Sequence, residues 1–250
     1  MKVLVGCEES QAVCLAFREL GHEAFSCDLK PCSGGKPEWH YQMDVFEAIK
    51  LQEWDLGIFF PDCTYLTCSA EWAYKEPPYH QKVKPGTLVG KERIKARKAA
   101  SEFFMALYNC HIPKVAIENP VGVMSSIFRK PNQIIHPYNF GDDASKATCL
   151  WLKNLPLLNS TGYAEPRIVN GVKRWSNQTD SGQNKLSPSD NRAELRSKTY
   201  PGIAAAMAMQ WGNEQAYMDM NMAFRGQDRS VDYYQNTYAD PQAMYNPRKK

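Results

Sequence analysis

The sequence LGIFFPDC, residues 56–63, joins an apolar run to a proline, an aspartate and a cysteine. A continuous apolar run of this length is typical of a strand covered on both faces of a parallel sheet. The Pro61-Asp62 pair is typical of a turn that follows such a strand. The sequence therefore predicts that Cys63 lies just beyond the end of a buried strand, at the rim of a sheet.

Strand and helix patterns alternate around this run. Ser10 is suited to cap the first helix, and Gly21 to end it. Strand-helix alternation of this kind is typical of a doubly wound parallel sheet, so we predict an α/β fold. Besides residues 56–60, we expect strands at 2–5, 23–27, 114–117 and 148–152, and helices at 10–20, within 43–49, at 91–110 and at 203–211.

The composition favours one substantial folded domain. The chain has 250 residues, 43% of them apolar, and a net charge of +3. Its basic residues gather in two segments, 82–98 and 167–198, which suits a phosphate-rich partner.

The N-terminal residues do not resemble a signal peptide, and no run approaches the roughly 18 apolar residues that cross a membrane. We therefore expect a cytoplasmic protein with no membrane contact. Its eight cysteines should be free thiols. Their spacing fits no zinc motif, so we expect no metal site.

Chemically active residue types follow the ends of the expected strands. Ligands of open parallel sheets bind beyond the carboxyl ends of the strands, so these residues should share one edge. They are Gly6, Cys7, Glu8, Glu9 and Ser10 after the first strand, then Asp28, Asp44, Pro61-Asp62-Cys63 and Glu118-Asn119-Pro120.

Cys63 and Glu118 suit attack on an electron-poor pyrimidine ring. A thiolate at Cys63 would add to C6 while Glu118 contacts N3, and the adduct would make C5 nucleophilic enough to accept a methyl group. Asn119 would position the turn and hold the loop that carries Cys63. The alternative for Cys63 is a buried core thiol, the default for a free cysteine, and we interpret Cys68 in that structural way.

The acidic residues predict a site for a nucleoside cofactor. Asp28, at the end of the second strand, is placed to bond both ribose hydroxyls, and Asp44 could bind the adenine amino group. The turn at residues 6–10 is not a GxGxxG phosphate loop, and it suits the methionine part of S-adenosylmethionine, which has no phosphates. We also expect Pro61 to contact this cofactor. Both aspartates could instead be turn formers at strand ends.

These segments resemble the cytosine-C5 DNA methyltransferases, especially the short members found in bacteriophages and prophages. The region of Asp44 is similar to the adenine-contacting motif of that family. VLVGCEESQAVCLAFRELGHEAFSCDL resembles its cofactor motif, WDLGIFFPDCTYLTCS its Pro-Cys loop, VAIENP its Glu-Asn motif, and RSKTYPGIAAAMAMQWG its last motif. The resemblance implies a Rossmann-like, S-adenosylmethionine-dependent methyltransferase fold. It also implies methyl transfer to C5 of a flipped cytosine through a covalent Cys63 adduct.

The resemblance further implies a division of the chain. Residues 1–158 and 196–212 would form the catalytic domain, 159–195 a small, loop-rich target-recognition region, and 213–250 a polar extension. The partner would be double-stranded DNA, bound by a monomer or weak dimer in a bacterium or phage-infected cell. We expect DNA contacts from Arg93, Arg97, Lys146 and Arg174.

Four residues in three segments depart from the family pattern. Asp62 precedes the cysteine in place of proline, Glu8 and Glu9 replace glycines of the cofactor turn, and Pro120 follows Glu-Asn in place of valine. Three other functions therefore stay open. They are transfer of a different one-carbon group from a modified donor, a catalytically silent DNA-binding protein, and an enzyme that acts on a free pyrimidine nucleotide.

Overall fold

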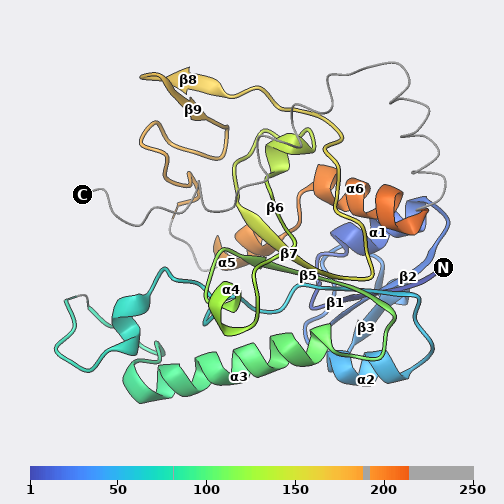
Figure 1. Ribbon diagram of the computed structural model, residues 1–250, viewed down its shortest axis with the longest axis horizontal. Helices are drawn as coiled ribbons and strands as arrows, with labels where there is room; N and C mark the ends of the chain where they lie inside the picture. The colour runs from blue at the N-terminus through green and yellow to red at the C-terminus, as the bar shows by residue number, and fades with distance from the viewer. Residues whose placement is uncertain (81, 188–191, 214–250) are drawn as a thin grey trace.

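The computed structural model describes residues 1–80, 82–187 and 192–213 (Figure 1). A seven-stranded sheet forms its centre, in the order β3-β2-β1-β4-β5-β7-β6. The strands are β1 (Lys2–Gly6), β2 (Glu23–Asp28), β3 (His40–Gln42), β4 (Leu56–Phe59), β5 (Lys114–Pro120), β6 (Gln133–Ile135) and β7 (Thr148–Lys153), with a separate hairpin of β8 (Arg167–Val169) and β9 (Val172–Arg174). The helices are α1 (Ala12–Glu19), α2 (Val45–Lys50), α3 (Gly90–Tyr108), α4 (Met124–Ile127), α5 (Arg192–Ser197) and α6 (Pro201–Gly212).

The predicted α/β, Rossmann-like fold is confirmed. Strands β1 to β5 are mutually parallel, and the order of the sheet reverses at the neighbouring strands β1 and β4. Such a reversal is the place where open α/β sheets bind their ligands. Strand β7, for which the sequence predicted no direction, runs antiparallel to β5 and β6. The connection from β6 to β7 contains no long crossover helix, and parallel neighbours need one.

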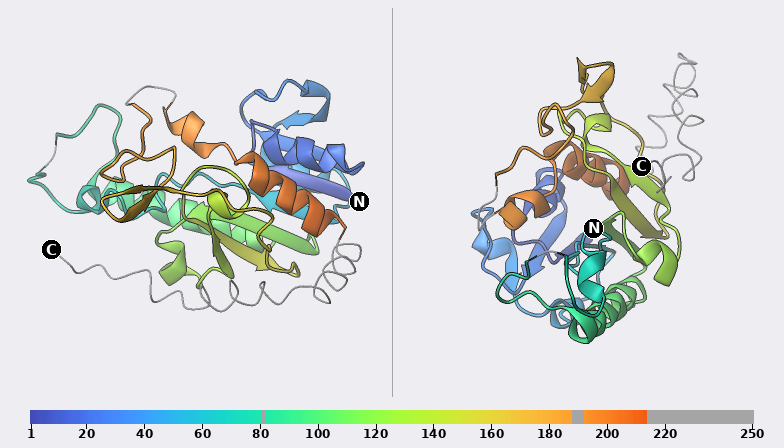
Figure 2. Two further views of the ribbon diagram at one scale, coloured as in Figure 1. Left: turned by 90° about the horizontal axis from the view of Figure 1, so that it is seen from above. Right: turned by 90° about the vertical axis from the view of Figure 1, so that its left-hand side faces the viewer.

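Helices cover both faces of the sheet. Figures 1 and 2 show α1 and α6 together on one face, with α2 and α3 on the other. Alternate residues of a strand point to opposite faces. In β1, Val3 accordingly packs in the core that contains Phe17 and Trp211, while Leu4 packs in the core that contains Phe104. Burial of the central strands on both faces explains their unbroken apolar sequences.

The start of α1 differs from the prediction. Ser10 does not cap this helix; the cap position belongs to Gln11, which has a left-handed backbone (φ 59°) and makes no side-chain cap. The carboxylate of Glu8 instead accepts hydrogen bonds from the backbone N–H groups of Val13 (2.7 Å) and Cys14 (3.2 Å). A negative charge at a helix N-terminus stabilises the helix, so Glu8 takes over the role expected of Ser10.

The described part of the segment 159–195 is largely irregular, as expected, but it also contains the β8–β9 hairpin and the start of α5. Apart from Asn213, the extension predicted at 213–250 lies outside the described residues. The division of the chain into catalytic and recognition parts and the monomeric or weakly dimeric state stay predictions. Within the described ranges, no helix has the length and apolar character needed to span a membrane.

Glu8 predicts a measurable dependence of stability on pH. Burial raises the pKa of its carboxyl from 4.5 to about 7, against the opposing effect of its two hydrogen bonds. The folded state therefore binds more protons than the unfolded chain between pH 4.5 and 7, and stability falls as pH rises through that window. The loss amounts to roughly 2–3 kcal/mol.

Glu8→Gln removes this titration. From pH 5 to pH 8 the free energy of unfolding of Glu8→Gln should therefore increase relative to that of the wild type. Urea unfolding at several pH values measures the difference. Glu47→Gln, at an exposed carboxylate paired with Lys50, is the matched control and should run parallel to the wild type. A constant offset between Glu8→Gln and the wild type over this range would contradict the assignment.

Candidate active site

The carboxyl ends of β4 and β5 bring the Cys63 and Glu118 segments together. Phe59 pairs with Ile117 in parallel register, and the chains continue side by side beyond them. The buried Asn119 side chain donates a hydrogen bond through Nδ2 to the carbonyl oxygen of Pro61 (2.8 Å). Thus the residue after Glu118 fixes the turn that leads into Cys63.

Strand β5 is longer than predicted. We expected it to end at residue 117, but it runs to Pro120 because β7 supplies an antiparallel partner along its whole length. Glu118 and Asn119 therefore lie in regular strand backbone, opposite Leu150 and Cys149. A side chain on a paired strand has a more fixed position than one on a loop.

The chain after Cys63 packs closely against the chain after β5. Thr67 forms an antiparallel bridge with Gly122, and Val123 N–H donates to the Leu66 carbonyl (2.8 Å). A Cβ atom added to Gly122 would lie 2.1 Å from the Leu66 oxygen, so only glycine fits there. This contact was not predicted from the sequence, although the glycine that follows Glu-Asn-Pro closely could have indicated it.

Charges of both signs act on the half-buried Cys63 thiol. Burial raises its pKa, the carboxylates of Asp62 and Glu118 raise it further, and Lys146 lowers it. Asp62 accepts hydrogen bonds through Oδ1 from the backbone N–H and the hydroxyl of Thr64 (2.9 and 2.7 Å). The thiolate of Cys63 is therefore disfavoured in the protein without substrate.

Glu118 has the properties of a buried acid. Burial raises its pKa, whereas Lys146 and a hydrogen bond from Thr148 lower it. Its Oε1 atom is buried and has no hydrogen-bond partner in the part of the chain that the structure describes. Buried polar atoms are nearly always hydrogen-bonded, so an unpartnered one beside a thiol suits a ligand. Thr148 was missed from the sequence because the direction of β7 was not known.

Three carboxylates act electrostatically on Cys7 at the carboxyl end of β1. Burial raises the pKa of this thiol, and Asp28, Asp44 and Asp62 add to the shift, together with Cys27. Cys7 has a left-handed backbone (φ 60°), which turns the chain sharply at the end of the strand. An acidic edge attracts a cation, such as a sulfonium or ammonium group, and repels phosphate.

The two aspartates also have local roles. Asp28 accepts a hydrogen bond from Lys30 N–H (2.9 Å), and Asp44 caps α2 through Phe46 N–H (2.8 Å). Each bond uses the Oδ1 atom of its aspartate. Both aspartates thus act as local turn and cap residues, as the alternative interpretation predicted. These roles do not conflict with a ligand on the same edge.

Gly6 and Glu8 have reasons in the fold itself. A Cβ atom on Gly6 would lie 2.6 Å from side-chain atoms of Phe59 and Val45, so packing accounts for the glycine. The carboxylate of Glu8 is committed to the N-terminus of α1. The proposed cofactor site therefore does not include Gly6 or Glu8.

Residues after β2 fold back over the turn that contains Glu9 and Ser10. Ser33 N–H donates to the Glu9 carbonyl (2.8 Å). Gly34 packs so closely that an added Cβ atom would lie 2.6 Å from the Ser10 carbonyl oxygen. The carbonyl groups of this turn face the protein, and a cofactor contact would use its other atoms.

Two arginines of α3, Arg93 and Arg97, make their contacts within the protein. Arg93 is 6% exposed, donates to the Leu88 carbonyl (3.2 Å), and lies over the ring of Tyr74. Arg97 donates to the Tyr65 carbonyl (2.9 Å) and to other groups within the protein. The Arg93 side chain is buried and the Arg97 guanidinium binds groups of the protein itself, which argues against the DNA contacts predicted for both arginines.

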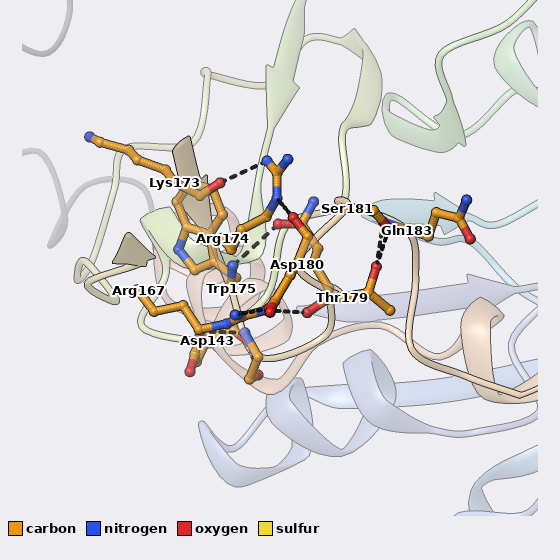
Figure 3. A network of polar contacts seen from close by, with 11 residues as sticks. Asp143, Arg167, Lys173, Arg174, Trp175, Thr179, Asp180, Ser181 and Gln183 are labelled. Atoms are coloured by element: carbon orange, nitrogen blue, oxygen red, sulfur yellow. Dashed lines mark hydrogen bonds and ion pairs between the residues drawn. The ribbon is translucent and has the colours of Figure 1, made fainter. Parts of the chain in front are cut away.

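Lys146 and Arg174 lie in different settings. Lys146 acts on both Cys63 and Glu118, and its Nζ donates to the Arg196 carbonyl (3.1 Å). The Arg174 guanidinium donates to the carbonyls of Asp180 (3.0 Å) and Lys173 (3.1 Å), as Figure 3 shows. The DNA contacts expected of Lys146 and Arg174 stay predictions.

Aromatic stacking holds the hairpin region on the body of the protein. The Trp175 ring stacks on Tyr138 with centroids 4.2 Å apart, and both side chains are buried. Arg167 forms an ion pair with Asp180 within the same region (Figure 3). Across residues 1–80, 82–187 and 192–213, no group of three or more His, Cys, Asp or Glu side chains could hold a metal ion.

No family model and no curated protein matches the chain. Among solved structures, it is similar to an E. coli protein described as a DNA modification methyltransferase encoded within a prophage, with a TM-score of 0.38 and 11% identity over 61% of this chain and 46% of the other. It is also similar to the S. pombe Dnmt2 methyltransferase, with a TM-score of 0.38 and 16% identity over 63% of this chain and 52% of the other. The chain spans about half the length of each.

The charges around Cys63 predict the effect of Asp62→Asn. This variant removes a charge that raises the pKa of Cys63 but keeps an oxygen that can accept from Thr64. Only the thiolate reacts with iodoacetamide, so alkylation of Cys63 at pH 7.5 should accelerate about 2- to 10-fold. Site-resolved mass spectrometry measures the rate.

The exposed Cys68 serves as an internal control and should keep its rate. Lys146→Met should act in the opposite direction and slow alkylation of Cys63. An unchanged or slower rate in Asp62→Asn would show that the carboxylate does not govern this thiol.

Proposed function

We propose that the protein is an S-adenosylmethionine-dependent DNA methyltransferase that modifies C5 of cytosine, with Cys63 as the nucleophile and Glu118 as the group that binds N3. The observation that carries the proposal is the junction of β4 and β5. There the Asn119–Pro61 hydrogen bond holds the thiol-bearing turn beside a carboxyl that has one unpartnered buried oxygen. Glu118 raises the pKa of Cys63, so the two groups are near enough to interact.

Cys63 and Glu118 divide the chemistry between them. The Cys63 thiolate adds to C6, and Glu118, whose burial favours the neutral acid, would donate to N3 as electron density moves into the ring. C5 of the adduct is then nucleophilic and accepts the methyl group. Loss of the C5 proton to a base restores the ring and releases the Cys63 sulfur. These ring atoms are unreachable within a stacked duplex, so the target base must be flipped out.

The acidic edge at β1, β2 and β4 is the proposed cofactor site. S-adenosylmethionine supplies the methyl group from a positively charged sulfonium, and the negative charges that act on Cys7 suit that sulfonium. Asp28 would bind the ribose hydroxyls and Asp44 the adenine amino group. The negative charge of this edge would repel a nucleotide phosphate, which supports S-adenosylmethionine over a dinucleotide as the cofactor.

Double-stranded DNA is the proposed substrate. Lys146 is the cation that acts on Cys63 and Glu118, and it would approach the backbone beside the flipped nucleotide. The hairpin region, which carries Arg174, would face the duplex. Phosphate contacts of this kind make binding weaken steeply with salt.

A covalent trap tests the nucleophile. In 5-fluorocytosine, fluorine replaces the C5 proton that must leave, so the methylated adduct cannot eliminate and stays bound to Cys63. A random-sequence duplex that contains 5-fluorocytosine removes the need to know the recognised sequence. We expect a complex that survives denaturing electrophoresis and requires S-adenosylmethionine.

Cys63→Ser should abolish this complex, whereas Cys68→Ser, at an exposed thiol five residues further on, should retain it. A complex formed by Cys63→Ser, or its loss only in Cys68→Ser, would assign the nucleophile to another residue. No complex in the wild type, despite DNA binding, would contradict the proposed reaction.

A binding measurement tests the cofactor site separately. Asp28→Ala removes a carboxylate from the acidic edge and should weaken S-adenosylmethionine about tenfold or more in calorimetric titration, the value of one charge-assisted hydrogen bond. Asp55→Ala is the control, because Asp55 accepts a hydrogen bond from Lys2 N–H where β1 begins, away from that edge. Equal affinities for the wild type and Asp28→Ala would place the cofactor elsewhere.

A further inference from the structure

Arg97 binds the backbone that follows Cys63. Its Nε donates to the Tyr65 carbonyl (2.9 Å), and its Nη2 donates to the Thr67 carbonyl (3.2 Å). The same Nη2 forms an ion pair with Glu71 Oε1 (2.6 Å). One side chain of α3 thus spans two carbonyl groups within four residues of the thiol.

Tyr74 holds this guanidinium in place. The Arg97 Cζ atom lies 3.5 Å from the centre of the Tyr74 ring, and the Tyr74 hydroxyl donates to the same Tyr65 carbonyl (3.0 Å). The Arg97 side chain is only 17% exposed. Ring stacking on one side and the Glu71 carboxylate on the other leave it little freedom, as is typical of a preorganised arginine fork.

The opposite side of the same loop is anchored to β5 and the residues after it. Asn119 binds the Pro61 carbonyl, and Val123 N–H binds the Leu66 carbonyl. Cys63 therefore lies between anchors that precede and follow it in the chain. Its own carbonyl oxygen accepts from the N–H groups of Leu66 and Thr67 (3.0 and 3.1 Å), which closes the loop into a compact turn.

We propose that Arg97 is a positioning residue, which holds Cys63 at the site by fixing the carbonyl groups of Tyr65 and Thr67. The inference rests on the proposed role of Cys63 as the nucleophile, and it replaces the DNA contact that the sequence suggested for Arg97. A displacement of about 1 Å can cost a reaction roughly 100-fold in rate. The planar fork of arginine is required, because a lysine ammonium has neither the reach nor the geometry to bind both carbonyls.

Arg97→Lys is the central test, since it keeps the charge and removes the fork. We expect the maximal rate of methyl transfer to fall about 10- to 100-fold. The affinities for DNA and S-adenosylmethionine should stay within about 3-fold, and the salt dependence of DNA binding should not change. Tyr74→Phe, which deletes one donor to the Tyr65 carbonyl, should lower the rate less and in the same direction.

A second measurement does not depend on methyl transfer. Release of the loop should increase iodoacetamide alkylation of Cys63 at least about 3-fold in Arg97→Lys, because the thiol is half-buried in the anchored loop. Hydrogen exchange of the Leu66 and Thr67 amides should also accelerate. Lys50→Met, at an exposed cation of α2, is the control and should change neither.

Two results would overturn the proposal. One is an unchanged alkylation rate and unchanged exchange at residues 63–67 in Arg97→Lys. The other is an unchanged maximal rate in Arg97→Lys together with a salt slope of DNA binding that falls by about one in the charge-removing variant Arg97→Gln, which would make Arg97 a phosphate contact. If the wild type transfers no methyl group at all, the proposed function fails, while the alkylation and exchange measurements still decide whether Arg97 holds the loop.

Discussion

The hydrogen bond from Asn119 to the Pro61 carbonyl fixes how two neighbouring strands of the sheet end. Both groups are buried, so an unpaired Asn119 amide or Pro61 carbonyl would cost free energy on the order of 1–3 kcal/mol. The bond therefore holds the turn at Pro61 in one position relative to β5. The places of Cys63 and of the loop after it, relative to Glu118 on β5, depend on that position.

Protonation of Glu118 links the two halves of the proposed chemistry. As a carboxylate, Glu118 opposes the Cys63 thiolate, and burial favours its neutral form. The neutral acid can donate to a ring nitrogen and no longer raises the pKa of the thiol. One protonation state thus serves both the nucleophile and the contact with N3, and the two groups should titrate as a coupled pair. Lys146 attracts negative charge on either group.

Much of the fold could be predicted from local patterns. Residues 56–60 and 115–117 are apolar without interruption, which identified β4 and β5 and placed Cys63 and Glu118 near their carboxyl ends. The direction of β7 could not be predicted, because it depends on the path of an irregular connection. Thr148, which binds Glu118, was missed for the same reason. The cap of α1 was assigned to Ser10 because the sequence does not show that Glu8 folds back onto the helix.

The arginines of α3 show where charge alone misleads. Residues 82–98 contain seven cations and one acid, a composition that suits a DNA-facing surface. The direction of a side chain depends on its position around the helix. Arg93 and Arg97 point toward Tyr65 and Tyr74, not toward a DNA-facing surface. Their positive charges contact aromatic rings and backbone carbonyls, so they organise the loop after Cys63.

Mass spectrometry of nucleosides from the DNA of cells that express the protein tests the central claim most directly, because it reports both the modified base and the added group. The account predicts 5-methyl-2′-deoxycytidine above the level of the host, present with Cys68→Ser and absent with Cys63→Ser. A cytosine carrying a different added mass would contradict methyl transfer. An unmodified nucleoside pool, or equal modification by Cys63→Ser, would contradict the role of Cys63 itself.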